Sequence, residues 1–287
     1  MSEALLAVQG VLRCPHCAAS IKIDAGVAKC DAGHSFDIAR QGYVNFLTNH
    51  TFIKNADSAA MVEALRKMQA RPYFQNLAQQ LAQVCEGLCR DISLPVIIEP
   101  GGGTGFYAHA ATQMVSGAVA ISFDISVHAA KVCARQSSRV AAVVADVWQP
   151  WLISENSADI VLSVFSPRNF AETERVLNSG GTLIVVAPED HHLVELRSQF
   201  NALSIQHDKS ETISALLGNF TKMEQFVHQS TELLDGQAMY ETLLSGPNGH
   251  HLQPKDMEAI LQSEPLDVTH SVSISIWKLN IDARASE

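Results

Sequence analysis

The fold is decided by the stretch Glu99-Pro100-Gly101-Gly102-Gly103-Thr104-Gly105, which stands between an apolar run and a helical pattern. The apolar run is Val96-Ile97-Ile98, and the helical pattern covers residues 106–116. Glycines at alternate positions let the backbone turn sharply and approach a ligand without a Cβ in the way. The helix that follows presents free amides to the same ligand. This order of strand, glycines and helix predicts a nucleotide-binding turn and disfavours the alternative, a glycine-rich structural loop.

Further short apolar runs follow this turn and alternate with helical stretches. The runs cover residues 96–98, 118–123, 140–145, 160–165 and 182–187, and the candidate helices cover 106–116, 126–136 and 170–178. Continuous runs rich in Val and Ile are typical of parallel strands that are covered on both faces. Two later strands, near 225–234 and 268–279, predict an antiparallel edge. The sequence therefore predicts an α/β, Rossmann-like domain with a mostly parallel seven-stranded sheet.

The spacing of the glycines distinguishes between nucleotide ligands. A dinucleotide fingerprint needs another glycine after two intervening residues, but position 106 is Phe. The spacing Gly-x-Gly-x-Gly after an acidic residue suits S-adenosylmethionine, whose sulfonium and amino groups are cationic. Glu99 can serve this ligand through water or by shaping the turn. We therefore expect a class I S-adenosylmethionine-dependent methyltransferase whose cofactor contacts include Glu99, Gly101, Gly102, Gly103, Thr104 and Gly105.

Two more acidic residues close the next two apolar runs. Asp124 follows Phe123, where a carboxylate can accept both ribose hydroxyls, and Asp146 follows Ala145, where adenine's amino group needs an acceptor. Each alone is equally compatible with a helix N-cap. Three acids at three successive strand ends favour the cofactor pocket, which Val147 and Phe165 are expected to complete.

The stretch Phe165-Ser166-Pro167-Arg168-Asn169 follows the fourth run. In open α/β sheets, ligands lie in the crevice at the carboxyl ends of the strands. We therefore expect this loop to face the methyl acceptor, with Ser166, Arg168 and Asn169 as substrate-binding residues. Methyl transfer depends chiefly on positioning. Asp37, Glu189 and Asp190 are the available candidates for a general base, and no catalytic residue is assigned.

A second chemical motif precedes the methyltransferase region. The spacing of Cys14-Pro15-His16-Cys17 and of Cys30-Asp31-Ala32-Gly33-His34 is Cys-x2-Cys-x12-Cys-x3-His. Zinc prefers four tetrahedral sulfur and nitrogen ligands, which two such knuckles supply. Four protein ligands leave no open position, so Cys14, Cys17, Cys30 and His34 predict a structural zinc site. His191, His192, His250 and His251 are expected to be surface loop histidines.

Composition limits the class of protein. The chain has 287 residues, a net charge of −10 and no apolar stretch long enough to span a bilayer. The N-terminal sequence does not predict a secretory signal, and the few cysteines suit a reducing cytoplasm. Residues 1–90 carry a net charge of +2 and the remainder −12, so the N-terminal third is the plausible RNA-binding part. We expect a zinc module at 1–47, a helical linker region at 48–92 and the methyltransferase domain at 93–287.

Most of the chain resembles the 23S rRNA (guanine-N1)-methyltransferases. The resemblance lies in the zinc motif joined to Arg40-Gln41-Gly42-Tyr43-Val44-Asn45, in Asp146-Val147-Trp148, in the loop from Phe165 to Asn169, and in His192-Leu193 with Glu195-Leu196. It implies a homodimer that methylates N1 of a guanine in the hairpin-35 loop of 23S rRNA, at position 745 or 748. The sequence Ser166-Pro167-Arg168-Asn169 resembles the corresponding sequence in the branch of this family that is linked to macrolide resistance. Pro100, Gly102 and Glu99 depart from the family's more usual residues.

Two other functions are compatible with the residues alone. One is a methyltransferase of the same fold that acts on a small molecule, for which the zinc module has no evident use. The other is a noncatalytic module that binds the cofactor or RNA.

Overall fold

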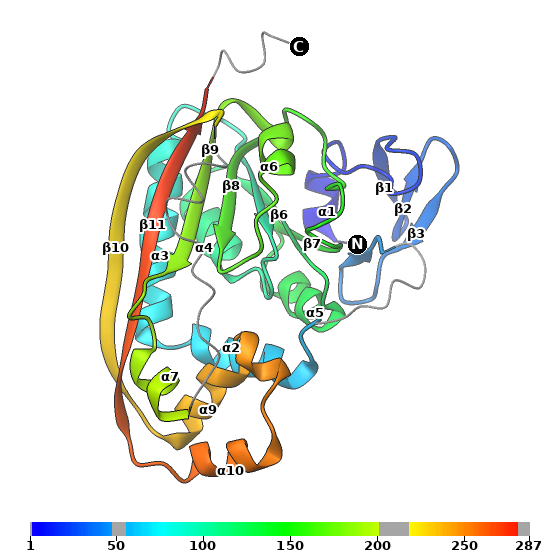
Figure 1. Cartoon of the computed structure of the whole chain (residues 1–287). Helices are drawn as coiled ribbons and strands as arrows, with labels where there is room; N and C mark the ends of the chain where they lie inside the picture. Colours follow the sequence, from blue (N-terminus) through cyan, green and yellow to red (C-terminus); the bar gives the residue numbers. More distant parts are fainter. Residues whose placement is uncertain (1, 48–55, 201–217, 281–287) are drawn as a thin grey trace.

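The computed structural model describes residues 2–47, 56–200 and 218–280. Within these ranges the central sheet has eight strands in the spatial order β10-β11-β9-β8-β5-β6-β7-β4 (Figure 1). The strands are β4 (Val44–Asn45), β5 (Val96–Pro100), β6 (Val119–Asp124), β7 (Val140–Val144), β8 (Ala158–Val164), β9 (Leu177–Pro188), β10 (Phe220–Leu234) and β11 (Leu266–Leu279). Neighbours from β4 to β9 run parallel, and β11 runs antiparallel to β9 and β10. The predicted mostly parallel sheet with an antiparallel edge is confirmed, but it has eight strands instead of seven because β4 adds to the edge of β7.

Helices cover both faces of this sheet, which explains its continuous apolar runs. Ile97 and Ile98 of β5 are both fully buried, and successive strand residues point to opposite faces. Ile97 belongs to a core cluster with α3 and α4, while Ile98 belongs to one that includes α1. The helices are α1 (Glu3–Ala7), α2 (Ala59–Gln69), α3 (Pro72–Leu88), α4 (Phe106–Met114), α5 (Val127–Gln136), α6 (Phe170–Val176), α7 (Val194–Phe200), α9 (Gly236–Leu244) and α10 (Pro254–Leu261), with a 3-10 turn at Pro247–His250.

The N-terminal module packs directly on the sheet. It contains a small antiparallel sheet of β1 (Ile21–Asp24), β2 (Val27–Cys30) and β3 (Ser35–Asp37), and then β4 adds to the free edge of β7. Leu5, Ile21 and Phe46 share one buried cluster with Phe123 and Trp151 of the larger body. The hydrophobic core is thus continuous across the expected boundary at residue 47, and the division of the chain at 47 and 92 stays a prediction.

A group of C-terminal helices lies at the end of the sheet toward which β8 and β9 point (Figure 1). Helices α7, α9 and α10 enclose a third cluster that includes Leu196, Leu234 and Met239. Helix α2 is joined to α9 by the ion pair Lys67–Glu241, at 2.8 Å. These contacts place α2 beside the carboxyl ends of the parallel strands. No helix in the described ranges is long and apolar enough to cross a membrane.

Candidate active site and metal centre

The glycine turn (residues 99–105) leads from β5 into α4, as predicted. Gly101, Gly103 and Gly105 have φ values of +59°, +54° and +72°. This left-handed region costs other L-residues about 1–2 kcal/mol, so the turn requires glycine at alternate positions. The Gly103 amide donates to Asp124 Oδ2 at 3.0 Å. The turn is therefore fixed to the end of β6, the neighbouring strand.

Position 102 requires glycine for a different reason, because it has no room for a side chain. A Cβ at this position would lie 2.2 Å from Ser122 Oγ and 2.5 Å from Glu99 Oε2. The Ser122 hydroxyl donates to Glu99 Oε2 at 2.8 Å, and both side chains are buried. Gly102, one of the unusual residues noted in the sequence, therefore allows a hydrogen-bonded carboxyl group to support the turn from within the protein.

Burial determines the protonation of Glu99. It raises the pKa of this carboxyl to about 8, against the opposing effect of the Ser122 hydrogen bond. Glu99 is then mostly protonated and neutral near pH 7. Of the two roles considered for Glu99, this geometry favours shaping the turn over acting as a charged partner of the cofactor.

Asp124 supports the glycine turn and lies near a second acidic residue, Asp57. Its Oδ1 accepts from the Ser126 amide at 2.8 Å, while Oδ2 accepts from Gly103. Burial raises the pKa of Asp124 to about 6, and the nearby carboxyl of Asp57 adds to this. Asp57 lies just before α2, and its carbonyl oxygen accepts from Ser126 Oγ at 2.7 Å. The carboxyl groups of Asp57 and Asp124 therefore lie close to the glycine turn, and in their ionised form they suit a cationic ligand such as S-adenosylmethionine.

Helix α2 covers the glycine turn, which the sequence alone did not indicate. Thr104 Oγ1 donates to Gln69 Oε1 at 2.7 Å, and both side chains are buried. Leu65 Cδ2 lies 3.3 Å from the position that a Cβ on Gly103 would occupy. Gln69 and Leu65 therefore position the turn from a segment more than thirty residues upstream in the chain.

Asp146 and Val147 follow β7, next to the strand that ends at Asp124. Asp146 Oδ1 accepts from the Trp148 amide at 2.9 Å, which forms a local turn. The Val147 side chain is buried, and its carbonyl oxygen accepts from Trp151 Nε1 and Asn169 Nδ2. The three predicted acids do lie at the carboxyl ends of the adjacent strands β5, β6 and β7, but each also accepts a hydrogen bond within the protein.

The loop after β8 (residues 165–169) lies against the glycine turn. A Cβ on Gly101 would come within 2.9 Å of Ser166 Cβ, and Ser166 Oγ is 3.1 Å from Ser163 Oγ. Asn169 is the N-cap of α6, where its Oδ1 accepts from the Glu172 amide. Arg168 lies beside Trp151 and Leu183, next to a space too small to hold a water molecule. Ser166 therefore lies beside the glycine turn, whereas the side-chain amide of Asn169 is used in hydrogen bonds that stabilise the fold.

Phe165, at the start of this loop, is exposed. Its side chain is 43% exposed, and its φ is +51°, a strained conformation for a bulky residue. Its ring lies 6.4 Å from the ring of His192, which follows β9. His192 is buried rather than on the surface, so the expectation for this histidine was wrong. The carboxyl ends of β8 and β9 bring the two residues together.

The candidate general bases occupy different parts of the molecule. Asp37 lies in β3 of the N-terminal module, and its side chain is exposed. Glu189 and Asp190 follow β9, and the Glu189 amide donates to the carbonyl oxygen of Ser271 at 3.0 Å. The geometry assigns no base.

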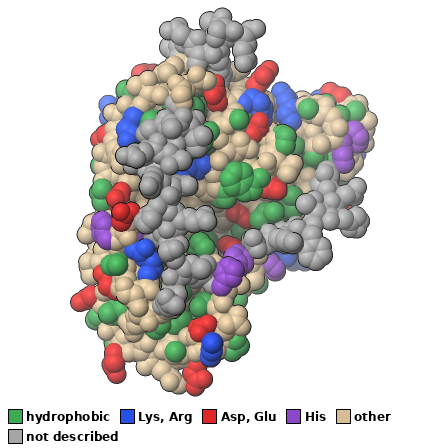
Figure 2. All heavy atoms as spheres, in the orientation of Figure 1, with side chains coloured by type: hydrophobic (Ala, Val, Ile, Leu, Met, Phe, Trp, Pro, Cys, Tyr) green, Lys and Arg blue, Asp and Glu red, His purple; other side chains and the backbone are tan. Residues whose placement is uncertain are grey.

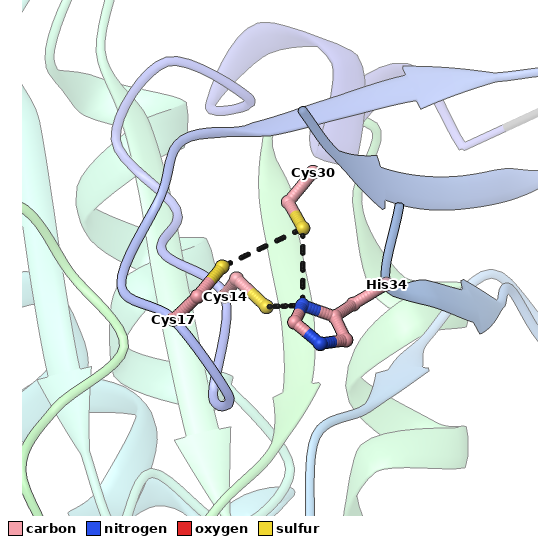
Figure 3. A group of neighbouring side chains, drawn as sticks. All are labelled: Cys14, Cys17, Cys30 and His34. Carbon is pink, nitrogen blue, oxygen red and sulfur yellow. Dashed lines mark hydrogen bonds between the residues drawn. The ribbon is translucent and has the colours of Figure 1, made fainter. Parts of the chain in front are cut away.

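The N-terminal motif forms a compact cluster of four side chains (Figure 3). The ligand atoms of Cys14, Cys17, Cys30 and His34 all lie within 4.8 Å of one another. His34 Nδ1 is 3.5 Å from Cys14 Sγ and 3.4 Å from Cys30 Sγ, and Cys17 Sγ is 3.7 Å from Cys30 Sγ. A tetrahedral zinc ion with ordinary bond lengths separates its ligands by about 3.5–3.8 Å. The donor set and its spacing therefore fit zinc.

Local turns position these ligands. The Ala18 amide donates to the Cys14 carbonyl, and the Gly33 amide donates to the Cys30 carbonyl. Ala18 and Gly33 both adopt positive φ, which closes each knuckle tightly. His16 is not part of the cluster, and its ring lies 4.8 Å from the ring of His34. With four protein ligands, the site is structural.

A cavity of about 490 Å³ separates the N-terminal module from α5. Its lining includes Arg40, Gly42 and Arg135. Gly42 precedes β4, and the end of α5 precedes β7, so this cavity lies at the amino edge of the sheet. Ligands of open α/β folds bind at the carboxyl edge. We therefore place the cofactor at the glycine turn and not in this cavity.

The surface charge is mixed on the face shown in Figure 2. Acidic and basic side chains are interspersed there, and the view shows no large area of a single sign. The modest positive charge of residues 1–90 is therefore not concentrated on this face.

Comparisons with known proteins cover both parts of the chain. The family model described as RlmA, N-terminal matches residues 12–51, and the one described as Methyltransferase domain matches residues 98–185. The 23S rRNA (guanine(748)-N(1))-methyltransferase of Streptomyces fradiae is 32% identical over 93% of this chain and 96% of its own length. A relative from Micromonospora griseorubida is 31% identical over 93% of this chain and 97% of its own length.

Solved structures are related at lower similarity. The YcgJ protein of Bacillus subtilis is 13% identical, with a TM-score of 0.48, over 70% of this chain and 98% of that one.

Proposed function

This chain belongs to the family of 23S rRNA (guanine-N1)-methyltransferases, and we propose on that basis that it methylates N1 of a guanine in the hairpin-35 loop of 23S rRNA. S-adenosylmethionine is the cofactor of its methyltransferase domain, and zinc is the metal of its N-terminal ribbon. One observation carries the proposal. A glycine turn with acidic surroundings and a Cys3His cluster occur in one chain. This chain aligns over 93% of its length with the 23S rRNA (guanine(748)-N(1))-methyltransferase of Streptomyces fradiae.

The glycine turn holds the cofactor in this proposal. The backbone of Gly101, Gly103 and Gly105 allows close approach, and α4 supplies an N-terminus directly after it. Asp124 and Asp146 accept from the ribose and the adenine, respectively, while Val147 and Phe165 line the pocket. Glu99 and Gly102 shape the turn. When bound, S-adenosylmethionine supplies an electrophilic methyl group.

The loop after β8 presents the acceptor base. Ser166 contacts the glycine turn, so a base held by this loop lies next to the cofactor pocket. Arg168 belongs to the same loop, and we assign it to the RNA side of the site, while Asn169 supports the loop through its hydrogen bonds to Val147 and Glu172. Residues of α2, above all Leu65, cover the turn and limit the access of water to it. The chain thus contributes mainly position and exclusion of water.

The zinc ribbon stabilises the N-terminal module and helps to bind RNA. Its metal has no open coordination position, so its contribution is to structure. The module shares a core with the sheet, which fixes it relative to the cofactor site. RNA contact by this part agrees with the net charge of +2 of residues 1–90, against −12 for the remainder.

The finer parts of the proposal concern the target and its consequence. The relative from Streptomyces fradiae is named for guanine 748, which favours this position over 745. Methylation there would confer resistance to a macrolide that binds nearby, and the enzyme would act in the cytoplasm as a homodimer. Light scattering of the purified protein checks the dimer, since a mass near 31.1 kDa would contradict it.

Transfer of a tritiated methyl group tests the reaction. The protein is incubated with labelled S-adenosylmethionine and unmodified 23S rRNA, and the label in RNA is counted. We expect about one methyl group per 23S rRNA, and none with Gly103→Val, because a β-branched residue cannot adopt the φ of +54° at this position. Cofactor binding without transfer to RNA would contradict the proposal.

A further inference from the structure

The segment from Glu189 to Glu195, after β9, is held firmly on β11. The Glu189 amide donates to the Ser271 carbonyl at 3.0 Å, and the Leu193 amide donates to the Thr269 carbonyl at 2.7 Å. The Glu195 carboxylate accepts from both the amide and the hydroxyl of Thr269, at 2.9 and 2.7 Å. His192, in the middle of this segment, therefore has a fixed position.

One hydrogen bond sets the tautomer of His192. Its Nδ1 accepts from the Ser271 amide at 3.0 Å, so in the neutral ring the proton is on Nε2. Burial lowers the pKa of His192 to about 3, and neighbouring His270 and Arg197 add to the effect. The ring is neutral at physiological pH and presents an N–H donor at Nε2. Nε2 makes no hydrogen bond to a described residue, and it is not one of the fully buried side-chain atoms that lack a partner.

This donor lies beside the acceptor loop. The rings of His192 and Phe165 are 6.4 Å apart, and Ser166, the next residue, contacts the glycine turn. Phe165 and Leu193, the residue after His192, both adopt positive φ, at +51° and +53°. Strained non-glycine residues persist where the surrounding structure enforces them, and such strain collects at functional sites.

We propose that His192 is a catalytic residue which donates a hydrogen bond from Nε2 to O6 of the target guanine. The inference rests on the proposed function, because it takes the base to be a guanine held by the loop after β8. O6 is bonded to C6, next to N1, and its lone pairs accept a hydrogen bond. A neutral histidine suits this role because it donates without carrying a charge.

The donor assists the reaction at N1. Guanine N1 loses its proton to water, and the negative charge that develops spreads onto O6. The N1 lone pair then forms a bond to the methyl carbon, and the carbon–sulfur bond breaks with its electron pair left on sulfur. The products are N1-methylguanine and S-adenosylhomocysteine. A preorganised donor at O6 stabilises the charge as it develops, which is where such groups accelerate a reaction.

Two substitutions separate this role from a structural one. In His192→Asn, the side-chain oxygen replaces Nδ1 and keeps the Ser271 bond, but the outer donor is lost. In His192→Gln, the amide nitrogen reaches the position of Nε2 and restores the donor. His191→Asn is the matched control, because the His191 side chain is exposed and contacts Gln229. The readouts are kcat and KM with 23S rRNA, cofactor affinity by calorimetry and the zinc content.

This catalytic role predicts that His192→Asn lowers kcat about 100- to 1000-fold, as for removal of one oxyanion donor, with cofactor affinity and zinc content unchanged. It predicts that His192→Gln retains kcat within about tenfold of the unsubstituted protein. A His192→Asn protein with full kcat, or a His192→Gln protein no faster than His192→Asn, would overturn the inference. Failure of the unsubstituted protein to methylate 23S rRNA would refute the proposed function instead, so the two failures are distinguishable.

Discussion

Gly105→Ala should destabilise the protein through two separable effects in the glycine turn. The first is conformational, because Gly105 has a φ of +72°, which costs an alanine about 1–2 kcal/mol. The second is steric, because the new Cβ would lie 2.4 Å from Cys133 Sγ. Cys133 is buried on α5, and overpacking of a core costs about 1–3 kcal/mol. Together they predict a loss of about 2–5 kcal/mol in the free energy of unfolding.

Cys133→Ala separates the steric effect from the conformational one. Alone it removes one buried atom and should cost about 1 kcal/mol. Combined with Gly105→Ala, it removes the clashing sulfur and leaves Cys133 Cβ at 3.3 Å, which is tight but tolerable. The double variant should therefore be more stable than Gly105→Ala alone by about 1–2 kcal/mol. Gly26→Ala is the conformational control, since its φ is +83° and its Cβ would meet nothing within 4 Å.

Urea unfolding followed by tryptophan fluorescence measures all four variants, and calorimetry measures their cofactor affinity. Gly26→Ala should lose only the conformational cost of about 1–2 kcal/mol. Effects of Gly105→Ala and Cys133→Ala that add within about 0.5 kcal/mol would refute the reasoning, because residues in direct steric conflict must couple.

Three further predictions follow from the site and the metal centre. Cys17→Ser should lower the zinc content and the unfolding midpoint, while His16→Ala should retain the metal; full zinc in Cys17→Ser, measured by atomic absorption, would exclude this cysteine as a ligand. Cofactor affinity should be full above pH 6 and fall as pH drops through about 6, because Asp124 becomes protonated there, and Asp124→Asn should be weaker and show no such step. Glu99→Gln should keep cofactor affinity within a few-fold, and a large loss of affinity would show that the charge of Glu99 is used. Because burial opposes ionisation of Glu99, the unsubstituted protein should lose stability as pH rises toward about 8, and Glu99→Gln should not show this loss.

Much of the architecture follows from local patterns. Continuous apolar runs identified the parallel strands, and the expected helical linker region contains α2 and α3, with Pro72 at the first turn of α3. The two-residue strand β4 was not predicted, because Val44 and Asn45 carry no pattern, and their pairing with β7 depends on a module that packs from far away in sequence. Helices α9 and α10 were also missed, since their core is completed by residues of other elements.

The site was predictable in its residue types but less so in their environments. The four zinc ligands and the glycine turn have fixed spacings, so sequence was enough to place them. The state of Glu99 depends on complete burial beside Ser122, which only the packed structure provides. Gln69, Leu65 and His192 reach the site through tertiary contacts, and the Ser271 amide that orients His192 is 79 residues away in the chain.

The central claim is tested most directly by locating the methyl group. The purified protein is allowed to react with unmodified 23S rRNA, and the RNA is then analysed by nuclease digestion with mass spectrometry and by reverse transcription. We predict 1-methylguanosine as the modified nucleoside and a single stop of the reverse transcriptase in the hairpin-35 loop, since a methyl group on N1 blocks base pairing. A methyl group on another base, on another atom of guanine or at a site outside this loop would contradict the account.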